Sequence, residues 1–322
     1  MILPLSAHLP TPSRLALGCM GFGGHWDHSP VTEQHVGEAH AALEAAISVG
    51  ITLLDHADIY TRGKAERTFG EIFRRAPSIR DGLLIQTKCG IRFADSTAPG
   101  RYDLSRDYIL GAVDASLSRL GTDWIDVLLL HRPDPLMEPE QIAEAFDRLR
   151  SSGKVAHFGV SNMQANQMRW LQRALSAPLI VNQLEMNLLK LDWLDGDSCF
   201  NDPAVAGSLP WAGTVQYCQE QGVQLQAWSP LAKGWLSGAL PATAAPAITT
   251  TSQVVEELAT QYDVGPEAVV LAWLMRHPAG IQPVIGTTRP ERIRACAAAT
   301  RVPLTREQWY RLYVTARGAM LP

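Results

Sequence analysis

The chain has 322 residues, of which 46% are hydrophobic and 19% are charged, and its formal net charge at pH 7 is -4. These values are typical of a globular protein with a large core, and α/β barrels of this length commonly form one domain. The slight negative charge, without any run of like charges, argues against nucleic-acid partners. No apolar stretch is long enough to span a bilayer, so we expect no membrane partner.

The N-terminal sequence is not typical of a signal peptide. No basic residue precedes its short apolar stretch, and prolines occur early, at positions 4 and 10. We therefore expect a cytoplasmic protein. The five cysteines are odd in number, widely spaced and without a CxxC pair, which indicates free thiols rather than a disulfide framework or a zinc site.

Short apolar runs alternate with longer segments of helical periodicity. Eight of the runs are predicted strands, at 14–18, 51–55, 83–88, 124–131, 154–162, 179–183, 223–229 and 282–287. Three of the segments between them are predicted helices. The first follows Thr32 as N-cap and ends at Gly50, and the other two end at Gly121 and Gly153. The segment 234–252 is rich in Ala, Pro and Thr and is predicted to be a loop.

The alternation of strands and helices indicates the fold class. Such strands pair in parallel through right-handed crossovers, and eight strand–helix units close into a (β/α)8 TIM barrel. The competing fold is an open doubly wound sheet. The sequence argues against it because no GxGxxG follows the first strand, and GCMGFGG at 18–24 lacks the dinucleotide-binding spacing. We predict a single barrel domain over residues 1–322.

Polar side chains stand at the ends of consecutive predicted strands. The active site of a TIM barrel forms at the carboxyl ends of its strands, so these residues are predicted to converge at one mouth. Each of them alone has a structural explanation, such as capping a loop, but their repetition favours a site. They are Asp55 with Tyr60 beyond it, Lys88, His131, Ser161, Asn162, Gln183, Trp228 and Ser229.

The sequence resembles the aldo/keto reductase family. The matching stretches include LALGCMGFGG, TLLDHADIY, IQTKCG, DVLLLHRPDP, VAHFGVSN, AWSPLAKG and VIGTTRPERI, in family order and across nearly the whole chain. The resemblance implies a (β/α)8 barrel that binds NADP(H) across its mouth and reduces a small-molecule carbonyl substrate. It places the family's catalytic tetrad on Asp55, Tyr60, Lys88 and His131.

The resemblance also implies which residues bind the cofactor. The implied residues are Ser161, Asn162, Gln183 and Trp228 at the nicotinamide, Ser229, Leu231 and Gly234 along the pyrophosphate, and Gly286, Thr287 and Arg292 near the 2′-phosphate. Gly286 stands where many relatives carry a lysine, and Ala295 and Cys296 replace a polar residue often found near the adenine. These departures imply a moderate preference for NADPH over NADH.

The chemistry of carbonyl reduction requires residues of these types. The nicotinamide supplies only a hydride, so the protein must supply a proton, and Tyr60 is the candidate acid. A neighbouring ammonium on Lys88 favours the phenolate that is left behind, and a carboxylate on Asp55 keeps that ammonium charged. A neutral imidazole on His131 suffices to orient the substrate oxygen. This chemistry requires no metal.

Two other functions fit parts of the sequence. Lys88 could form a Schiff base in an aldolase, but a lysine preceded by Asp55 and Tyr60 and followed by His131 fits a proton relay better. The chain could instead be a cofactor-binding sensor or a channel-associated subunit, since fold does not determine function. The intact tetrad favours turnover.

Substrate specificity in this fold lies in the loops around the mouth. The candidate loops are 22–31, 132–137 and 186–209, the last with the aromatic residues Trp193, Phe200 and Trp211 in or beside it. These aromatic residues favour an apolar or ring-bearing carbonyl. His56 is expected to support the catalytic residues from behind, and Cys89 is expected to be an inert buried thiol.

Overall fold

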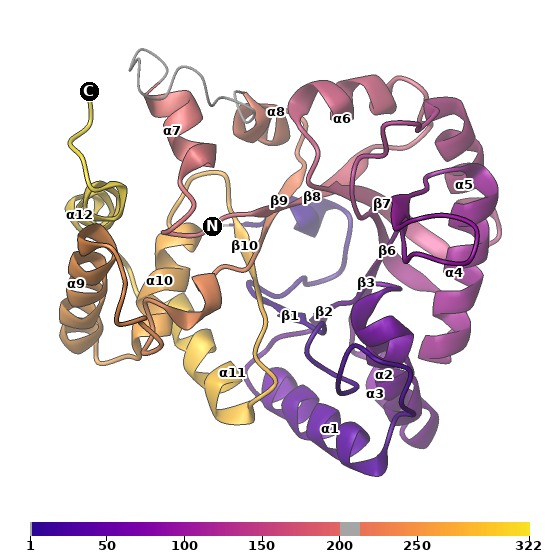
Figure 1. Ribbon diagram of the computed structural model, residues 1–322, viewed down its shortest axis with the longest axis horizontal. Helices are drawn as coiled ribbons and strands as arrows, with labels where there is room; N and C mark the ends of the chain where they lie inside the picture. Colours follow the sequence, from indigo (N-terminus) through magenta and orange to yellow (C-terminus); the bar gives the residue numbers. More distant parts are fainter. Residues whose placement is uncertain (1, 200–212) are drawn as a thin grey trace.

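The computed structural model describes residues 2–199 and 213–322. A closed barrel of eight parallel strands forms its centre (Figure 1). The strands are β1 (Ala16–Gly18), β2 (Leu53–Asp55), β3 (Leu84–Cys89), β6 (Ile125–Leu130), β7 (Val155–Ser161), β8 (Leu179–Glu185), β9 (Gln224–Trp228) and β10 (Gln282–Ile285). Pairing of β1 with β10 closes the ring. The eight predicted strands and the barrel are confirmed.

Helices surround the barrel, and α9, α10 and α12 gather on one side of it (Figure 1). The helices are α1 (Glu33–Ser48), α2 (Lys64–Arg75), α3 (Ser78–Asp81), α4 (Arg106–Leu120), α5 (Pro139–Ser151), α6 (Ala165–Gln172), α7 (Asp192–Ser198), α8 (Thr214–Glu220), α9 (Pro246–Tyr262), α10 (Pro266–Met275), α11 (Pro290–Ala297) and α12 (Arg306–Arg317). Short 3-10 helices are η1 (Pro4–Ala7), η2 (Tyr60–Gly63), η3 (Ala232–Gly234) and η4 (Ala298–Arg301). A hairpin of β4 (Ile91–Arg92) and β5 (Arg101–Tyr102) lies outside the barrel. No helix among the described residues has the length and apolar character of a membrane span.

The three predicted helices, α1, α4 and α5, are confirmed. Thr32 caps α1, because its hydroxyl accepts a hydrogen bond from the backbone N–H of His35 at 3.3 Å, and His35 Nδ1 accepts one in return. Gly121 ends α4 in the left-handed conformation, with φ of 62°, which glycine adopts without a steric penalty.

The prediction of a loop over 234–252 is wrong in its second part. Helix α9 begins at Pro246, where a missing N–H does no harm in a first turn. Its next residues, Thr249, Thr250 and Thr251, each donate a side-chain hydrogen bond to the carbonyl four residues earlier. Those bonds satisfy the hydroxyls within the helix, although the segment carries little apolar periodicity.

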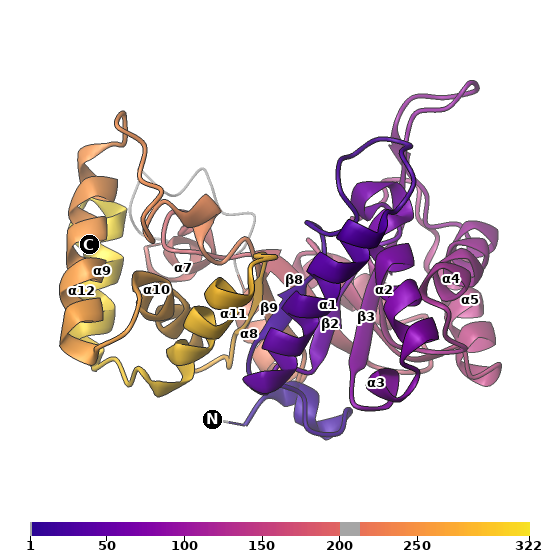
Figure 2. The same ribbon diagram turned by 90° about the horizontal axis from the view of Figure 1, so that it is seen from below.

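An apolar plug fills the amino end of the barrel. Leu5 of η1 packs with Leu3 and Leu9 against inward-facing strand residues such as Leu53 and Val127. This N-terminal segment lies under the strands in Figure 2. Because the plug closes one end of the barrel, the polar side chains inside the barrel lie toward the carboxyl ends of the strands, where the site forms.

Candidate active site

Lys88 organises the polar cluster at the mouth. Its Nζ donates hydrogen bonds to Asp55 Oδ2 at 2.7 Å, to Tyr60 OH at 2.9 Å and to the backbone oxygen of His56 at 2.9 Å. An ammonium has three N–H donors, and all three are used. The side chain of Lys88 is 1% exposed and that of Asp55 is 3% exposed. The structure therefore brings three of the four predicted tetrad residues into direct contact.

The charge on Lys88 is stabilised although the residue is buried. Burial opposes the ammonium, but the carboxylate of Asp55 and the hydroxyl of Tyr60 outweigh it and raise the pKa of Lys88 above its ordinary value. For Tyr60 the balance differs from our expectation. Burial has the largest effect and raises the pKa of the phenol, and the opposing effect of Lys88 is smaller. Tyr60 is therefore protonated at neutral pH and able to donate its proton.

His131 completes the group at the end of β6. Its ring meets that of Tyr60 edge to face, with 6.0 Å between the centroids. Burial, and then the charges of Lys88 and Arg132, hold the pKa of His131 well below its usual range. Its Nδ1 atom is buried and has no hydrogen-bond partner in the described part of the chain. The imidazole is therefore neutral and lines the cavity beside Tyr60.

The backbone after Tyr60 is held in an unusual conformation. Thr61 and Arg62 have φ angles of 46° and 60°, in the left-handed region that non-glycine residues rarely adopt. The Thr61 hydroxyl donates a hydrogen bond to the backbone oxygen of Phe22 at 2.8 Å, which ties this turn to the loop after β1. Such strain persists only where surrounding contacts compensate for it, and here it accompanies the placement of the phenol.

His56 contributes its backbone rather than its imidazole. The imidazole is fully buried, packs edge to face on Phe69 at 4.8 Å, and has a pKa lowered to about 3 by burial and by Lys88. Its carbonyl accepts from Lys88, as described above. The residue lies behind the predicted tetrad, and its side chain does not line the central cavity.

The sequence did not predict the network of glutamines that contacts Asp55. Gln86 and Gln183 each donate to Asp55 Oδ1, at 2.6 and 3.0 Å, and both also donate to Gln226 Oε1. Gln226 donates in turn to Gln282 at 2.9 Å. The signal was present, because a glutamine occurs within each of the apolar runs at 83–88, 223–229 and 282–287. A buried amide needs polar partners, which in a barrel lie across the interior.

Two adjoining cavities contain all ten residues that the resemblance assigned to cofactor binding. The central cavity, of about 320 Å³, is lined by Asp55, Tyr60, His131, Ser161, Asn162, Gln183, Trp228, Ser229 and Gly286 among others. The second, which we call the arginine cavity, has a volume of about 560 Å³ and is lined by residues that include Ser229, Leu231, Gly234, Gly286, Thr287 and Arg292. Met20, Ser229, Pro230 and Gly286 line both, so the two cavities adjoin each other.

The polar residues at the ends of β7, β8 and β9 are tied to one another. Trp228 Nε1 donates to Asn162 Oδ1 at 3.0 Å, and Asn162 Nδ2 donates to Ser161 Oγ at 2.8 Å. Ser161 Oγ donates to the backbone oxygen of Gln183 at 2.9 Å. Asn162 and Ser229 both have positive φ angles, 59° and 51°. This hydrogen-bonded cluster therefore forms one wall of the central cavity.

The arginine cavity is rich in cations. Arg292, Arg289 and Lys233 line it, with Glu267 as the carboxylate among its lining residues. Arg289 lies 3.5 Å from Glu291, whereas Arg292 has no ion-pair partner within the described residues. A Cβ atom at Gly286 would meet nothing within 4 Å, so the backbone there borders open space. The cavity therefore suits an anionic group.

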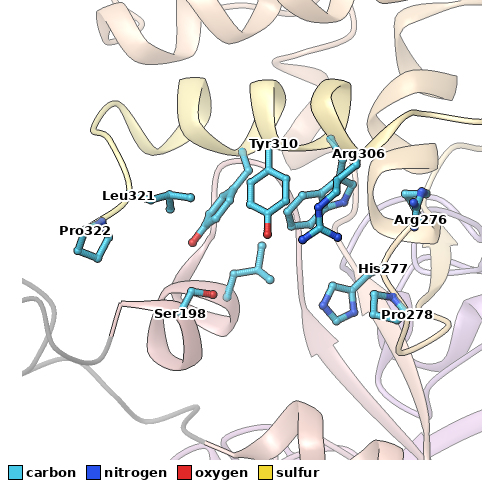
Figure 3. Close-up of a pocket in the computed structure, with 11 residues that line it drawn as sticks. Ser198, Arg276, His277, Pro278, Arg306, Tyr310, Leu321 and Pro322 are labelled. Carbon is cyan, nitrogen blue, oxygen red and sulfur yellow. The ribbon is translucent and has the colours of Figure 1, made fainter.

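Two further cavities have similar volumes. One, which we call the side cavity, has a volume of about 420 Å³ and is lined by residues that include Arg132, Asn162, Glu185, Lys190 and Trp228. The other, of about 440 Å³, lies between α12, α7 and the end of α10. In Figure 3, Arg306 and Tyr310 extend from α12 into this cavity, and His277 lies on its opposite side. None of the predicted catalytic or cofactor-binding residues lines that cavity, although Leu194 and Ser198 of the predicted substrate loop 186–209 do.

The predicted substrate loops lie only partly in the site. Trp26, in the loop 22–31, lines the central cavity. Trp193 does not, since it is buried and packs against Trp273 with 5.9 Å between the ring centroids. Phe200 and Trp211 lie outside the described residues.

A (β/α)8 barrel whose mouth combines a phenol, a buried lysine–aspartate pair, a neutral imidazole and a cation-lined cavity has the architecture of a barrel oxidoreductase. Comparison with known proteins agrees. The sequence matches the Aldo/keto reductase family over residues 14–313. The chain belongs to the aldo/keto reductase family.

Individual relatives match over most of the chain. A 6-dehydroglucose reductase of Agrobacterium fabrum is 39% identical over 311 residues, which cover 95% of each chain. A 6-dehydroglucose reductase of Novosphingobium aromaticivorans is 36% identical, with 88% of each chain covered. The crystal structure of an aldo-keto reductase from Klebsiella pneumoniae in complex with NADPH superposes with a TM-score of 0.72 at 24% identity, covering 94% of this chain and 90% of that one. That likeness shows the shared fold.

Proposed function

We propose that this protein is an NADP(H)-dependent reductase of aldehyde or ketone carbonyls, with Tyr60 as the general acid. The observation that carries the proposal is the position of Lys88, hydrogen-bonded at once to Asp55 and to Tyr60. Asp55 and Tyr60 line a cavity that adjoins a second, cation-lined one. The cofactor bound in the Klebsiella pneumoniae structure supports NADP(H) as the dinucleotide.

The residues of the site fit a nicotinamide dinucleotide. The side-chain oxygen atoms of Ser161, Asn162 and Gln183 provide hydrogen-bond acceptors for the N–H groups of a carboxamide, and Trp228 provides an aromatic face. Arg292 and the hydroxyl of Thr287 stand in the arginine cavity, where a phosphate would be held by charged hydrogen bonds. When bound, the nicotinamide supplies the hydride for the carbonyl carbon.

In this proposal, residues of the chain donate the proton and stabilise the charge that remains. Tyr60 donates its phenolic proton to the carbonyl oxygen as the alcohol forms. Lys88 stabilises the phenolate that remains, and Asp55 keeps Lys88 charged in its buried position. Neutral His131 orients the carbonyl oxygen by donating a hydrogen bond from its ring, which a neutral imidazole can do through its single N–H.

The structure argues against the aldolase alternative. A Schiff-base lysine must be unprotonated and must reach the substrate, and it is usually activated by a lowered pKa. Lys88 instead has a raised pKa, is 1% exposed, and uses all three of its donors within the protein. A sensor or channel-associated subunit with the same fold would bind the cofactor without reducing a carbonyl. An activity assay therefore distinguishes it from the proposed reductase.

The test is oxidation of NADPH in the presence of a panel of aldehydes. The panel includes benzaldehyde and 6-dehydroglucose, since two relatives are named as reductases of the latter. We expect aldehyde-dependent turnover that Tyr60→Phe removes. NADPH binding without turnover of any carbonyl would favour the sensor alternative, and borohydride trapping of a covalent substrate adduct on Lys88 would favour the aldolase.

A further inference from the structure

Three cavities follow one another across the barrel mouth. The central cavity joins the arginine cavity through Met20, Ser229, Pro230 and Gly286 on one side. It meets the side cavity through Arg132, Asn162 and Trp228 on the other. The strand order places the side cavity at the carboxyl ends of β6, β7, β8 and β9, which are consecutive in the barrel. The arrangement has the reacting centre in the middle and one cavity at each end.

The dinucleotide of the proposed function occupies the arginine cavity and the nicotinamide part of the central cavity. The side cavity contains only Asn162 and Trp228 from the set of residues assigned to the cofactor. These two residues form its border with the central cavity. The side cavity is therefore available to the part of the substrate that lies beyond the reacting carbonyl.

The side cavity is polar but balanced in charge. Its lining includes two cations, Arg132 and Lys190, and two carboxylates, Glu185 and Asp192. Lys190 and Asp192 pair with each other, with 2.9 Å between Nζ and Oδ2. Among the described residues neither Arg132 nor Glu185 has an ion-pair partner. Both are partly buried and line the cavity, so each is able to form hydrogen bonds with a ligand there.

Trp228 adds an apolar face to this polar cavity. Glu185 and Trp228 are partners in register on the neighbouring strands β8 and β9, so they lie side by side. The guanidinium carbon of Arg132 lies 5.8 Å from the centroid of the Trp228 ring. The cavity thus combines a fork of N–H donors, a carboxylate acceptor and an aromatic surface.

We propose that the side cavity is a subsite for the hydroxyl-bearing chain of a polyhydroxylated, uncharged aldehyde. Arg132 donates to neighbouring hydroxyl oxygens, and Glu185 accepts from hydroxyl protons. Apolar C–H groups of the same chain pack on Trp228. This inference rests on the proposed carbonyl reduction, and it makes Arg132 and Glu185 residues that determine specificity.

The charge balance argues against an anionic substrate at the same place. A carboxylate on the substrate would gain from Arg132, but it would face Glu185 and Asp192 in the same cavity. An apolar substrate would leave both Arg132 and Glu185 without partners in a closed complex, which costs free energy. A neutral polyol satisfies both residues at once.

The experiment measures kcat/KM for 6-dehydroglucose and for benzaldehyde in wild type, Arg132→Met and Glu185→Leu. Methionine keeps the length of the arginine stem, and leucine keeps most of the volume of the glutamate. We expect wild type to favour 6-dehydroglucose, and each variant to lose about 10-fold to 100-fold of that preference. The ratio of the two substrates cancels any effect of Arg132 on His131.

Arg301→Met is the matched control, because Arg301 is exposed on η4, far in sequence from the site, and has no ion-pair partner among the described residues. It should leave the substrate ratio unchanged. Quenching of tryptophan fluorescence by NADPH shows whether each variant is folded and binds cofactor. Binding of D-glucose, which has the hydroxyls but no reducible group at its sixth carbon, provides a readout that does not depend on turnover.

The outcomes separate this inference from the proposed function. Equal losses with both aldehydes in both variants would overturn the subsite. The subsite would also be overturned if wild type preferred succinic semialdehyde to 6-dehydroglucose and Arg132→Met abolished that preference. Arg132 would then bind an anionic group of the substrate. A wild type that reduces no aldehyde would contradict the proposed function alone, and weaker D-glucose binding by the variants would still support the subsite.

Discussion

Lys88 shows how one residue can set the chemistry of its neighbours. An isolated buried ammonium is costly, and it persists here because Asp55, Tyr60 and the His56 carbonyl accept hydrogen bonds from all three of its N–H groups. The same contacts place the positive charge next to the phenol. The stability of the cluster and its proposed function therefore depend on the same three hydrogen bonds.

Replacing Tyr60 by phenylalanine should remove carbonyl reduction and leave NADPH binding nearly intact. In the proposed mechanism the hydroxyl acts on the substrate oxygen, and loss of a general acid costs at least about 100-fold in rate. Steady-state kinetics together with a fluorescence titration of NADPH tests this. Near-normal turnover would show that another group donates the proton.

Lys88→Met should damage turnover as much as Tyr60→Phe does. Because the two residues act as one unit, the double variant should be little slower than either single one. The measurement is kcat for the four proteins of the cycle. Losses that multiply would show that Lys88 and Tyr60 act independently.

Asp58 should make stability depend on pH. Burial, followed by repulsion from Glu66, raises its pKa to about 7. An acid with a raised pKa binds its proton more tightly in the folded protein, so its unfavourable effect is absent below the unfolded pKa of about 4, grows between about pH 4 and 7, and is complete above the folded pKa of about 7. We expect Asp58→Asn to raise the melting temperature more at about pH 8 than at about pH 5. Parallel melting curves at the two pH values would contradict the assignment.

At the scale of single elements, the sequence predicted those helix ends that are determined by residues close together in the chain. Thr32 marks the start of α1, and Gly121 marks the end of α4, because capping involves groups within one turn. The start of α9 was missed because Pro246 and three threonines provide no apolar stripe, and their hydroxyl bonds are visible only in the structure. The predicted strands were confirmed with small shifts at their ends.

The capping box of α1 offers a test at this scale. Thr32→Ala removes the hydroxyl that accepts from the His35 N–H, and it should lower the free energy of unfolding by about 1 kcal/mol. Chemical denaturation measures the loss. Thr32→Ser restores an acceptor and serves as the control, so a serine variant as unstable as the alanine variant would assign the effect to the lost methyl group.

At the scale of the whole molecule, the sequence predicted which polar residues stand at the strand ends. It did not predict the hydrogen bonds that join polar residues across the barrel. Asp55, Lys88 and His131 end neighbouring strands, so their convergence follows from barrel topology. The glutamine network under Asp55 joins strands on opposite sides of the ring, and no local pattern pairs Gln86 with Gln226. The division of the mouth into three cavities likewise depends on side-chain packing across the barrel.

We expect the preference for NADPH over NADH to depend on the arginine cavity. The 2′-phosphate carries charge that the hydroxyl of NADH lacks, and charged hydrogen bonds contribute roughly 1.5 to 3 kcal/mol each. Gly286 provides no lysine, whereas Arg292 lines the arginine cavity without an ion-pair partner among the described residues. We therefore expect wild type to bind NADPH about 10-fold to 100-fold more tightly than NADH, and Arg292→Ala to lose most of this difference.

Titration of both cofactors, followed by quenching of tryptophan fluorescence, measures these affinities. Arg294→Ala is the matched control, because Arg294 is exposed on the same helix, α11, and does not line the cavity. It should keep the wild-type preference, since removing a charge outside the cavity leaves the contacts to the 2′-phosphate in place. Arg292 would have no role at the phosphate if wild type bound both cofactors equally. The same holds if Arg292→Ala weakened NADH binding as much as NADPH binding, because a group that contacts only the 2′-phosphate cannot affect a cofactor that lacks it.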